Sequence, residues 1–390
     1  MALSGGERRS APRLRIWVIA AFTVALVVLG GLRFARADLA GTSFFATDEY
    51  YTWTTDEGRF IDHLNIDISQ YLAMVEDYRG VDGAFEKQEP YEAFEDTGEA
   101  VKGPVDPFTS RVALPWLASL IPLDASYAWA LVNLALLTVG LWFLVDALAV
   151  SGRSPAAQAV GAALYTFALP VVVFASSLFI DGGVVGVLAI GYWLLARRAW
   201  WALVVFFPVS YLVKESLLVL APSAAWAWRT SGHRFGDARF VLGAGASALG
   251  VLGAAAWVTT TAPEAVYSFT VLPTWQYIRW NFTNPTSAVF FVVGLSTVVV
   301  PALLGARDLL AGSSWSEALR GPSGPDLVGF GAVALMNAYS LFSTDLTLRT
   351  GWLLWPFAIG LAAVWVDGNT RLRSRLEPVV GRGTAQPVAA

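Results

Sequence analysis

Carboxylates beside apolar segments are the side chains of this sequence best suited to chemistry. The stretch NIDISQYLAMVEDYRG at 65–80 begins with Asp67, and ATDEYYTW upstream holds the adjacent Asp48 and Glu49. A positioned carboxylate can accept the proton of an attacking hydroxyl group, which is general base catalysis. Asp67 and the Asp48–Glu49 pair are therefore the candidate catalytic residues.

Other charged residues interrupt sequence that is otherwise apolar. They are Asp181 in SSLFIDGGVVG, Lys214 and Glu215 in YLVKESLLVLAP, and Arg349 in STDLTLRTGWLLWP. Ionisable groups near lipid are costly, so each is a candidate functional residue. The structural alternatives are that Asp181 only begins a helix, where the helix dipole stabilises a carboxylate, and that Lys214 and Glu215 only pair with each other.

The amino-acid composition indicates a membrane protein. Of the 390 residues, 56% are hydrophobic and 14% are charged, against about 25% charged in soluble domains. The mean hydropathy is +0.55, and several apolar runs reach the roughly 20 residues that a membrane-spanning helix needs. We therefore expect a single all-α membrane domain over 1–390.

Hydropathy and basic residues together predict the topology. Candidate spans lie near 14–32, 125–150, 155–178, 180–196, 199–213, 215–229, 239–259, 286–306, 326–343 and 350–367. Basic residues gather in alternate connections, which the positive-inside rule assigns to the cytoplasm. We predict about ten transmembrane helices with both termini in the cytoplasm. The segment 199–229 is short for two crossings and is either two short helices or one hairpin that does not cross the membrane fully. The first apolar run is longer than that of a signal peptide, and Ala35-Arg36-Ala37 carries an arginine, which favours an uncleaved helix.

The segment 37–110 is the largest hydrophilic region and is predicted to be an extracytoplasmic loop with a juxtamembrane amphipathic helix. It contains 17 of the 30 acidic residues and four basic ones. Nucleic acid is therefore an unsuitable partner. A divalent cation is the one cofactor left open, although the calcium-loop spacing is absent.

Several residue types and motifs that other classes of site need are missing from the sequence. The chain has no cysteine, which excludes disulfides, thiolate metal sites and cysteine nucleophiles. It contains no glycine-rich phosphate loop, paired-histidine metal motif or dinucleotide fingerprint, and no metal site is predicted. The connection VYSFTVLPTWQYIRWNFTNP adds Arg279 among aromatic residues, which form either an interfacial belt or a sugar-stacking platform.

Taken in order, five motifs resemble bacterial polytopic membrane glycosyltransferases of the family C (GT-C) fold. They are DISQYLAM at 67–74, PFTSRVALPWLASLIP at 107–122, FIDGGVVGVLAIGYWLLARR at 179–198, VKESLLVLAP at 213–222 and LRTGWLLWPFAIGLAA at 348–363. The resemblance covers about 45–367 and depends on the order and the common sidedness of the motifs.

The resemblance implies transfer of a sugar from a polyprenyl-phosphate carrier to a glycan, lipid or protein acceptor on the outer face of the cytoplasmic membrane. It makes Asp67 the preferred base, with Asp48 as the competitor, because Asp67 also starts a segment whose Ile68, Tyr71, Leu72 and Val75 can share one interfacial face. Arg111 would position the loop or the phosphate. The donor site would also include Asp181, Lys214, Glu215, Arg279 and Arg349.

Two other classes of function stay open from the sequence. One is a transporter or flippase for an amphipathic anion, although such proteins usually carry repeats and discontinuous helices near the membrane midplane. The other is a non-catalytic subunit of an envelope-assembly complex in the membrane. The sequence favours the enzyme because its charged candidates fall on one predicted side.

The predicted topology can be tested by cysteine labelling, since no native cysteine interferes. Single cysteines at Asp82, Thr270 and Ser313 are treated with a membrane-impermeant thiol reagent in intact cells. We expect labelling at Asp82 and Thr270, which lie in predicted external connections, and none at Ser313. Labelling at Ser313 alone would reverse the orientation.

Overall fold

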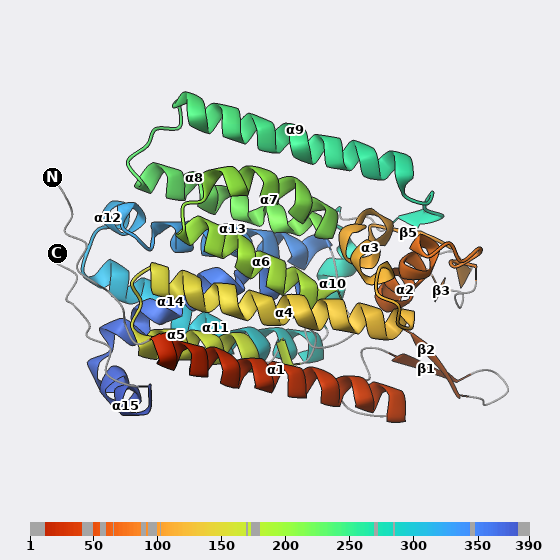
Figure 1. The fold of residues 1–390 in the computed structure, drawn as a ribbon, viewed down its shortest axis with the longest axis horizontal. Helices are drawn as coiled ribbons and strands as arrows, with labels where there is room; N and C mark the ends of the chain where they lie inside the picture. The colour runs from red at the N-terminus through yellow and green to blue at the C-terminus, as the bar shows by residue number, and fades with distance from the viewer. Residues whose placement is uncertain are drawn as a thin grey trace.

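The computed structural model is a bundle of helices that run mostly along one direction, with smaller elements at both ends (Figure 1). The structure describes residues 12–40, 50–54, 60–64, 66–86, 91–92, 100–101, 103–168, 171–172, 180–268, 272–283, 285–343 and 348–380. Asp48 and Glu49 lie outside these ranges.

The α-helices and 3-10 helices (η) account for most of the described chain. The first half contains α1 (Pro12–Ala40), α2 (Ile66–Tyr78), η1 (Phe108–Ser110), α3 (Ala113–Ser119), α4 (Ala125–Val150), α5 (Pro155–Phe167), α6 (Asp181–Ala196) and α7 (Trp200–Val213). The second half contains η3 (Glu215–Val219), α8 (Leu220–Thr230), α9 (Ala238–Thr261), α10 (Trp275–Thr283), α11 (Pro285–Ala311), α12 (Trp315–Arg320), α13 (Gly324–Ser343), η4 (Leu348–Leu354), α14 (Trp355–Gly368) and α15 (Thr370–Val380).

Short strands lie at one end of the bundle, and the sequence did not predict them. The antiparallel pairs are β1 (Tyr50–Thr54) with β2 (Phe60–Leu64) and β3 (Tyr91–Glu92) with β4 (Ala100–Val101). A parallel pair joins β5 (Val105–Asp106) to β6 (Tyr267–Ser268). The prediction of an all-α membrane protein is thus confirmed for the bundle, while the segment after α1 also contains strands.

Among the described residues, five helical segments are long and apolar enough to cross a membrane. They are Ala125–Val150, Ala238–Thr261, Gly294–Ala311, Gly324–Ser343 and Gly351–Gly368. Three shorter apolar helical segments, Ile16–Leu32, Asp181–Ala196 and Trp200–Val213, lie beside them. The number of ten crossings and their sidedness stay predictions.

The turn predicted within 199–229 is present, while the extent of membrane crossing stays a prediction. Helix α7 ends at Val213, and after Lys214 the chain turns into η3 and α8. The rings of Trp200, at the start of α7, and Trp228, near the end of α8, have centroids 5.2 Å apart. The two arms therefore run antiparallel and turn at Lys214.

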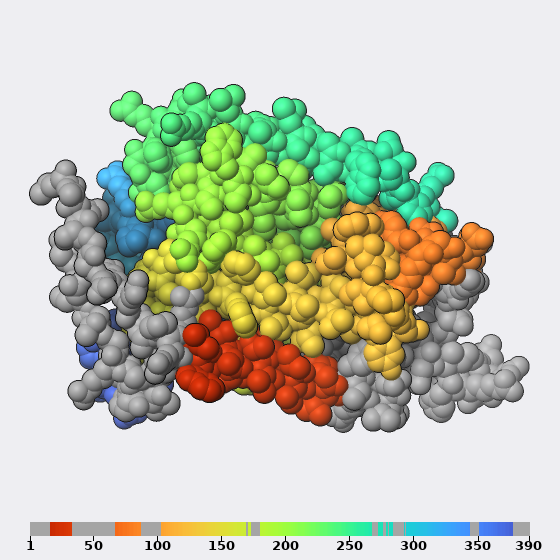
Figure 2. Space-filling view, in the orientation of Figure 1, coloured from red at the N-terminus to blue at the C-terminus, as the bar shows by residue number. Residues whose placement is uncertain are grey.

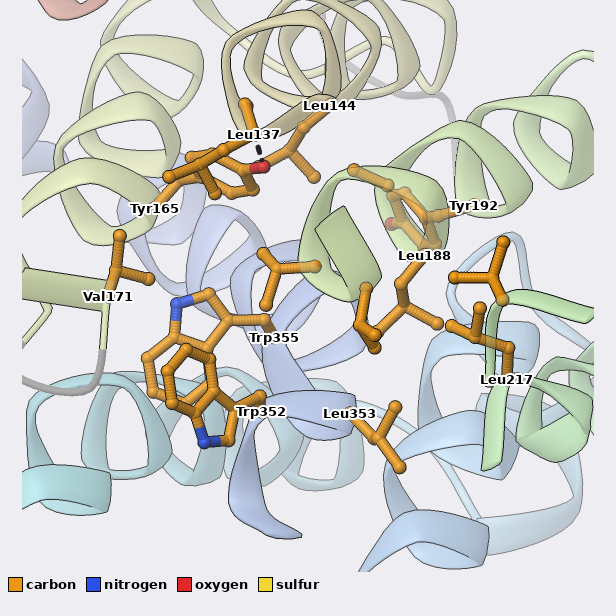
Figure 3. Packing of buried hydrophobic residues seen from close by; sticks show 14 of the residues in the cluster. Leu137, Leu144, Tyr165, Val171, Leu188, Tyr192, Leu217, Trp352, Leu353 and Trp355 are labelled. Atoms are coloured by element: carbon orange, nitrogen blue, oxygen red, sulfur yellow. Dashed lines mark hydrogen bonds between the residues drawn. The ribbon is translucent and has the colours of Figure 1, made fainter. Parts of the chain in front are cut away.

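The core lies where α4, α5, α6 and α14 meet. Leu137, Tyr165, Leu188 and Trp355 are buried there, and the Tyr165 hydroxyl donates a hydrogen bond of 2.9 Å to the Leu137 carbonyl (Figure 3). Burial falls towards the edge of the bundle: 78% of the residues in Gly351–Gly368 are buried, against 6% of an apolar 18-residue stretch of α9. Helix α14 is therefore central and α9 peripheral.

Two ends of the bundle are used below as reference points. The α2 end carries α2, α3 and α10, and the α12 end carries α12, α15 and the connection from α8 to α9 (Figure 1). Sequence reasoning predicted that the acidic loop and the candidate site share the outer side of the membrane, and that sidedness stays a prediction.

Glycine sets the close approach of α4 and α6. A Cβ atom at Gly186 would collide with the backbone of Leu136 on α4, so no larger residue fits there without moving a helix. Gly183, one turn earlier, donates its N–H to the Asn133 side-chain oxygen at 2.9 Å. The FIDGGVVG motif thus fixes α6 against α4 immediately after Asp181.

We expect Gly186→Ala to destabilise the protein by about 1–3 kcal/mol, the usual cost of overpacking a close-packed interior. The matched control is Gly245→Ala on α9, where a Cβ meets nothing within 4 Å. That change should be neutral or slightly stabilising, because alanine favours helix by up to about 1 kcal/mol over glycine. Thermal unfolding in detergent measures both, and equal melting temperatures would contradict the α4–α6 packing.

Candidate functional site

Two ion pairs meet at the turn between α7 and η3. Lys214 is extended, with φ −165° and ψ 127°, and so interrupts the helical backbone. Its Nζ lies 3.6 Å from Asp181 Oδ1 at the start of α6. The next residue, Glu215, receives hydrogen bonds from Arg111 at 2.7 Å to Oε1 and 3.2 Å to Oε2. The turn therefore joins α6 to the segment before α3.

Arg111 contacts both Glu215 and α2. Its Nε and Nη2 contact the two oxygens of Glu215, the bidentate geometry that gives arginine–carboxylate pairs their strength. Its Nη1 donates a third hydrogen bond, of 3.0 Å, to the Tyr71 hydroxyl on α2. The Arg111 side chain is 9% exposed and that of Glu215 is 44% exposed. The pair is thus covered on the arginine side and open on the carboxylate side.

Asp181 is almost fully enclosed. Its side chain is 3% exposed, whereas that of Lys214 is 17% exposed. A buried carboxylate needs a compensating charge, and two features of the fold supply it: the positive end of the α6 dipole and the Lys214 ammonium group. The predicted helix start at Asp181 is present, because α6 begins at this residue.

Helix α2 brings the preferred base into the same region. Asp67 lies in its first turn, 7% exposed, and precedes Tyr71 by four residues, so the two side chains share one face of the helix. Tyr71 stacks on Trp129 of α4 with ring centroids 5.1 Å apart, and its hydroxyl receives the Arg111 hydrogen bond. Asp67 therefore lies one helical turn from Tyr71, the residue through which α2 contacts Arg111.

The apolar face of α2 packs against protein. The sequence interpretation placed Ile68, Tyr71, Leu72 and Val75 on one interfacial face, yet Ile68, Tyr71 and Val75 are fully buried. Helix α2 contacts α3 and α4 rather than presenting this face to lipid. An apolar stripe looks the same for either environment, which is why the sequence could not distinguish them.

The Gln70 side chain connects α2 by hydrogen bonds to β5, the strand that precedes Arg111. Its side-chain oxygen accepts a 2.9 Å hydrogen bond from the Val105 N–H, and its amide nitrogen donates one of 3.0 Å to the Gly103 carbonyl. Strand β5 then pairs with β6, so the connection after α9 joins the same assembly. Gln70 was missed by sequence reasoning, although it lies within the quoted motif DISQYLAM.

Asp106 is a second residue that sequence reasoning missed. Burial raises the pKa of its carboxyl above the ordinary value, the Arg111 guanidinium opposes that shift, and the Glu215 carboxylate adds to it. The charges of both members of the central ion pair therefore affect the pKa of Asp106. Its position directly before the quoted motif PFTSRVALPWLASLIP was the available signal.

The other candidates separate from this cluster. Arg279 is exposed on α10, and no ion pair links it to the cluster within the described part of the chain. Arg349 lies in η4 by its backbone, and its side chain is outside the described residues, as are Asp48 and Glu49. Asp67, Arg111, Asp181, Lys214 and Glu215 are thus the predicted residues that the structure brings to one end of the bundle.

A divalent cation would need a group of oxygen or nitrogen ligands. Across the residues whose placement is described, no group of three or more histidine, aspartate or glutamate side chains converges as a metal site.

Comparison with known proteins adds no identification: no protein-family model matches the chain, and no curated protein matches it. The GT-C resemblance thus depends on the motifs quoted above.

A double-mutant cycle on Arg111→Gln and Glu215→Gln tests the central ion pair. Each single change leaves one charged partner uncompensated, so we expect each to cost about 1.5–3 kcal/mol of unfolding free energy, the range for hydrogen bonds to charged groups. The double variant should cost clearly less than the sum of the two, because neither charge is then left alone. Additive losses in detergent melts would contradict a direct interaction.

Proposed function

We propose that this protein is a membrane glycosyltransferase that moves a sugar from a polyprenyl-phosphate donor to an acceptor hydroxyl group at the α2 end. One observation carries the proposal. Four motifs that resemble the GT-C family contribute side chains to one cluster, although they are far apart in the sequence: Arg111 and Glu215 alone are separated by 104 residues. The combination of carboxylates and cations is the one that this reaction needs.

The proposed reaction is a displacement at the anomeric carbon of the sugar. The acceptor oxygen forms a bond to that carbon while the bond from the carbon to the phosphate oxygen breaks, and the electron pair leaves with the lipid phosphate. A carboxylate accepts the proton of the acceptor hydroxyl group. A cation stabilises the negative charge that grows on the departing phosphate.

Lys214 is best suited to contact the phosphate. Its distance of 3.6 Å from Asp181 exceeds the roughly 2.7–2.9 Å of a tight charge-assisted hydrogen bond, so this contact is an ion pair that a phosphate oxygen could replace. Lys214 also lies at a backbone turn, where three ammonium hydrogens can reorient. A phosphate could exchange for Asp181 as its main partner.

Arg111 is better suited to positioning than to phosphate binding. Its guanidinium group is already engaged by Glu215 and Tyr71, and it is nearly enclosed. Displacing Glu215 would leave a carboxylate without its partner, which is costly. Arg111 thus holds α2 and its first-turn Asp67 against the turn that carries Lys214.

Asp67→Asn tests the catalytic part of the proposal. Asparagine keeps the size of aspartate and cannot accept the proton, so transfer should fall by about 10²–10⁴-fold. Binding of undecaprenyl phosphate should persist, because Lys214 is unchanged. Purified protein in nanodiscs, supplied with undecaprenyl-phosphate hexoses and membrane acceptors, gives the transfer rate, and lipid titration gives the affinity.

Two matched variants assign the competing base. Asp48→Asn and Asp106→Asn should each retain substantial transfer. An inactive Asp48→Asn beside an active Asp67→Asn would move the base to ATDEYYTW. Full activity in all three variants, or no transfer by the unmodified protein with any donor, would overturn the enzyme proposal and favour the transporter.

Lys214→Ala probes the donor site in the same assay. It should weaken binding of undecaprenyl phosphate, with partial rescue in Lys214→Arg because arginine keeps the charge. Lys214→Ala also leaves Asp181 without this ion pair and should lower the melting temperature, whereas Lys214→Arg keeps the ion pair. If the lysine were only structural, lipid binding would fall only in proportion to that loss of stability. Melting curves recorded beside the binding titration separate these outcomes.

A further inference from the structure

A groove separates the peripheral helix α9 from the α7–α8 hairpin. It has a volume of about 690 Å³ and is lined by three helices and the connection from α8 to α9. That volume falls within the roughly 300–1,000 Å³ of small-molecule sites. Helix α9 forms the outer edge of the bundle here (Figures 1 and 2).

Small residues hold α9 against α7 while leaving the groove open on the α8 side. A Cβ at Gly250 would lie 2.5 Å from Pro208, and one at Gly243 would lie 3.4 Å from Val204. The Ser247 hydroxyl donates to the Val204 carbonyl at 3.5 Å. Opposite them, α8 presents Ala221, Ala224 and Ala225 to the groove. The space therefore results from short side chains on both walls.

The lining is apolar apart from one end. Ser247, His233 and Arg239 are the lining residues with a hydroxyl, imidazole or guanidinium group, and the last two lie at the α12 end. From Arg239 to Leu252 the α9 wall is about 20 Å long, at 1.5 Å per residue. One leaflet of a bilayer core is about 15 Å thick, so the groove suits one hydrocarbon chain.

Aromatic residues place the mouth of the groove at the membrane surface. The ring centroid of Trp228 lies 5.2 Å from that of Trp200 and 4.3 Å from that of His233, on which Trp228 stacks. The next residue after Trp200, Trp201, is 68% exposed. Tryptophan concentrates where lipid headgroups meet the hydrocarbon. A lipid whose tail fills the groove would thus have its headgroup beside His233 and Arg239.

The charge at this mouth selects the headgroup. Arg239 lines the mouth, Arg234 lies in the connection from α8 to α9, and Arg229 lies in the last turn of α8. No residue that the structure describes forms an ion pair with any of the three. The one acidic side chain in 229–239 is Asp237, which already accepts a 2.9 Å hydrogen bond from the Arg234 N–H and lies 3.8 Å from His233. Basic pockets between membrane helices are suited to anionic lipid headgroups.

We infer that the α7–α8–α9 groove binds an anionic phospholipid, with one acyl chain between the helices and the phosphate beside Arg239 and Arg234. The inference is independent of the sugar transfer proposed above, because it uses none of the residues at the α2 end. The bound lipid would join α9 to α8 across the groove, in addition to the contact that α9 makes with α7.

The test compares phosphatidylglycerol with phosphatidylcholine on the delipidated full-length protein. Native mass spectrometry counts the bound lipid, and thermal melts measure the stabilisation that a ligand of the folded state provides. Phosphatidylglycerol should bind preferentially, with one tightly held molecule. Arg239→Gln should weaken its binding about fivefold, the effect of one arginine near an anionic surface, and Arg239→Lys should restore most of it.

Two glycine variants on α9 separate groove binding from general adsorption. Gly243→Leu places a side chain in the groove and should abolish tight binding, whereas Gly245→Leu, at a position with nothing within 4 Å, should not. Equal binding of both lipids, or phosphatidylglycerol binding that survives Gly243→Leu, would overturn the inference. If the unmodified protein forms dimers and Gly243→Leu alone abolishes them, the occupant of the groove is a second copy of the chain. That result would also overturn the inference.

Discussion

The ion pair between Arg111 and Glu215 is the constraint on which the α2 end of this protein depends. It connects a segment preceding α3 to a turn inside the helical bundle, and its third hydrogen bond reaches α2 through Tyr71. Gln70, one residue earlier, then joins α2 to β5, and β5 pairs with β6. The position of Asp67 thus follows from a chain of polar contacts that begins at Arg111.

Charge balance explains why the cluster is stable. Two cations and two carboxylates meet, and each buried member has an opposite charge within reach: Arg111 has Glu215, and Asp181 has Lys214. Removing any one leaves an uncompensated charge in a partly dry environment, which is more costly than the pair itself is stabilising. A ligand phosphate would enter such a cluster by exchanging with a carboxylate, and the longer Lys214–Asp181 contact is where that exchange is easiest.

Small residues are used in opposite ways in the core and at the α9 edge of the bundle. At the α4–α6 contact, Gly186 brings two backbones together and leaves no space between them. At α9, Gly243 and Gly250 support contact with α7, while the alanines of α8 leave a groove open. Lipid is as apolar as a leucine side chain, so the hydrophobic effect does not drive helices together inside a membrane. Van der Waals packing therefore determines which helices contact each other. A helix with as little buried surface as α9 is well suited to being held by a lipid.

The sequence by itself determined the helical membrane class, the start of α6 at Asp181 and the turn at Lys214 and Glu215. Hydropathy is sufficient for the first, since a backbone in lipid must satisfy its hydrogen bonds within each helix. The other two are local, because a carboxylate favours a helix start and adjacent charges interrupt an apolar run.

Only the tertiary structure decided which charges pair, that the apolar face of α2 is buried in protein, and that Gln70 and Asp106 belong to the cluster. An apolar stripe has the same pattern whether it faces lipid or protein, and a side chain's partner depends on a distance in space. Periodicity along the chain specifies neither, because the contacts of Arg111 and Asp181 form only when distant helices pack.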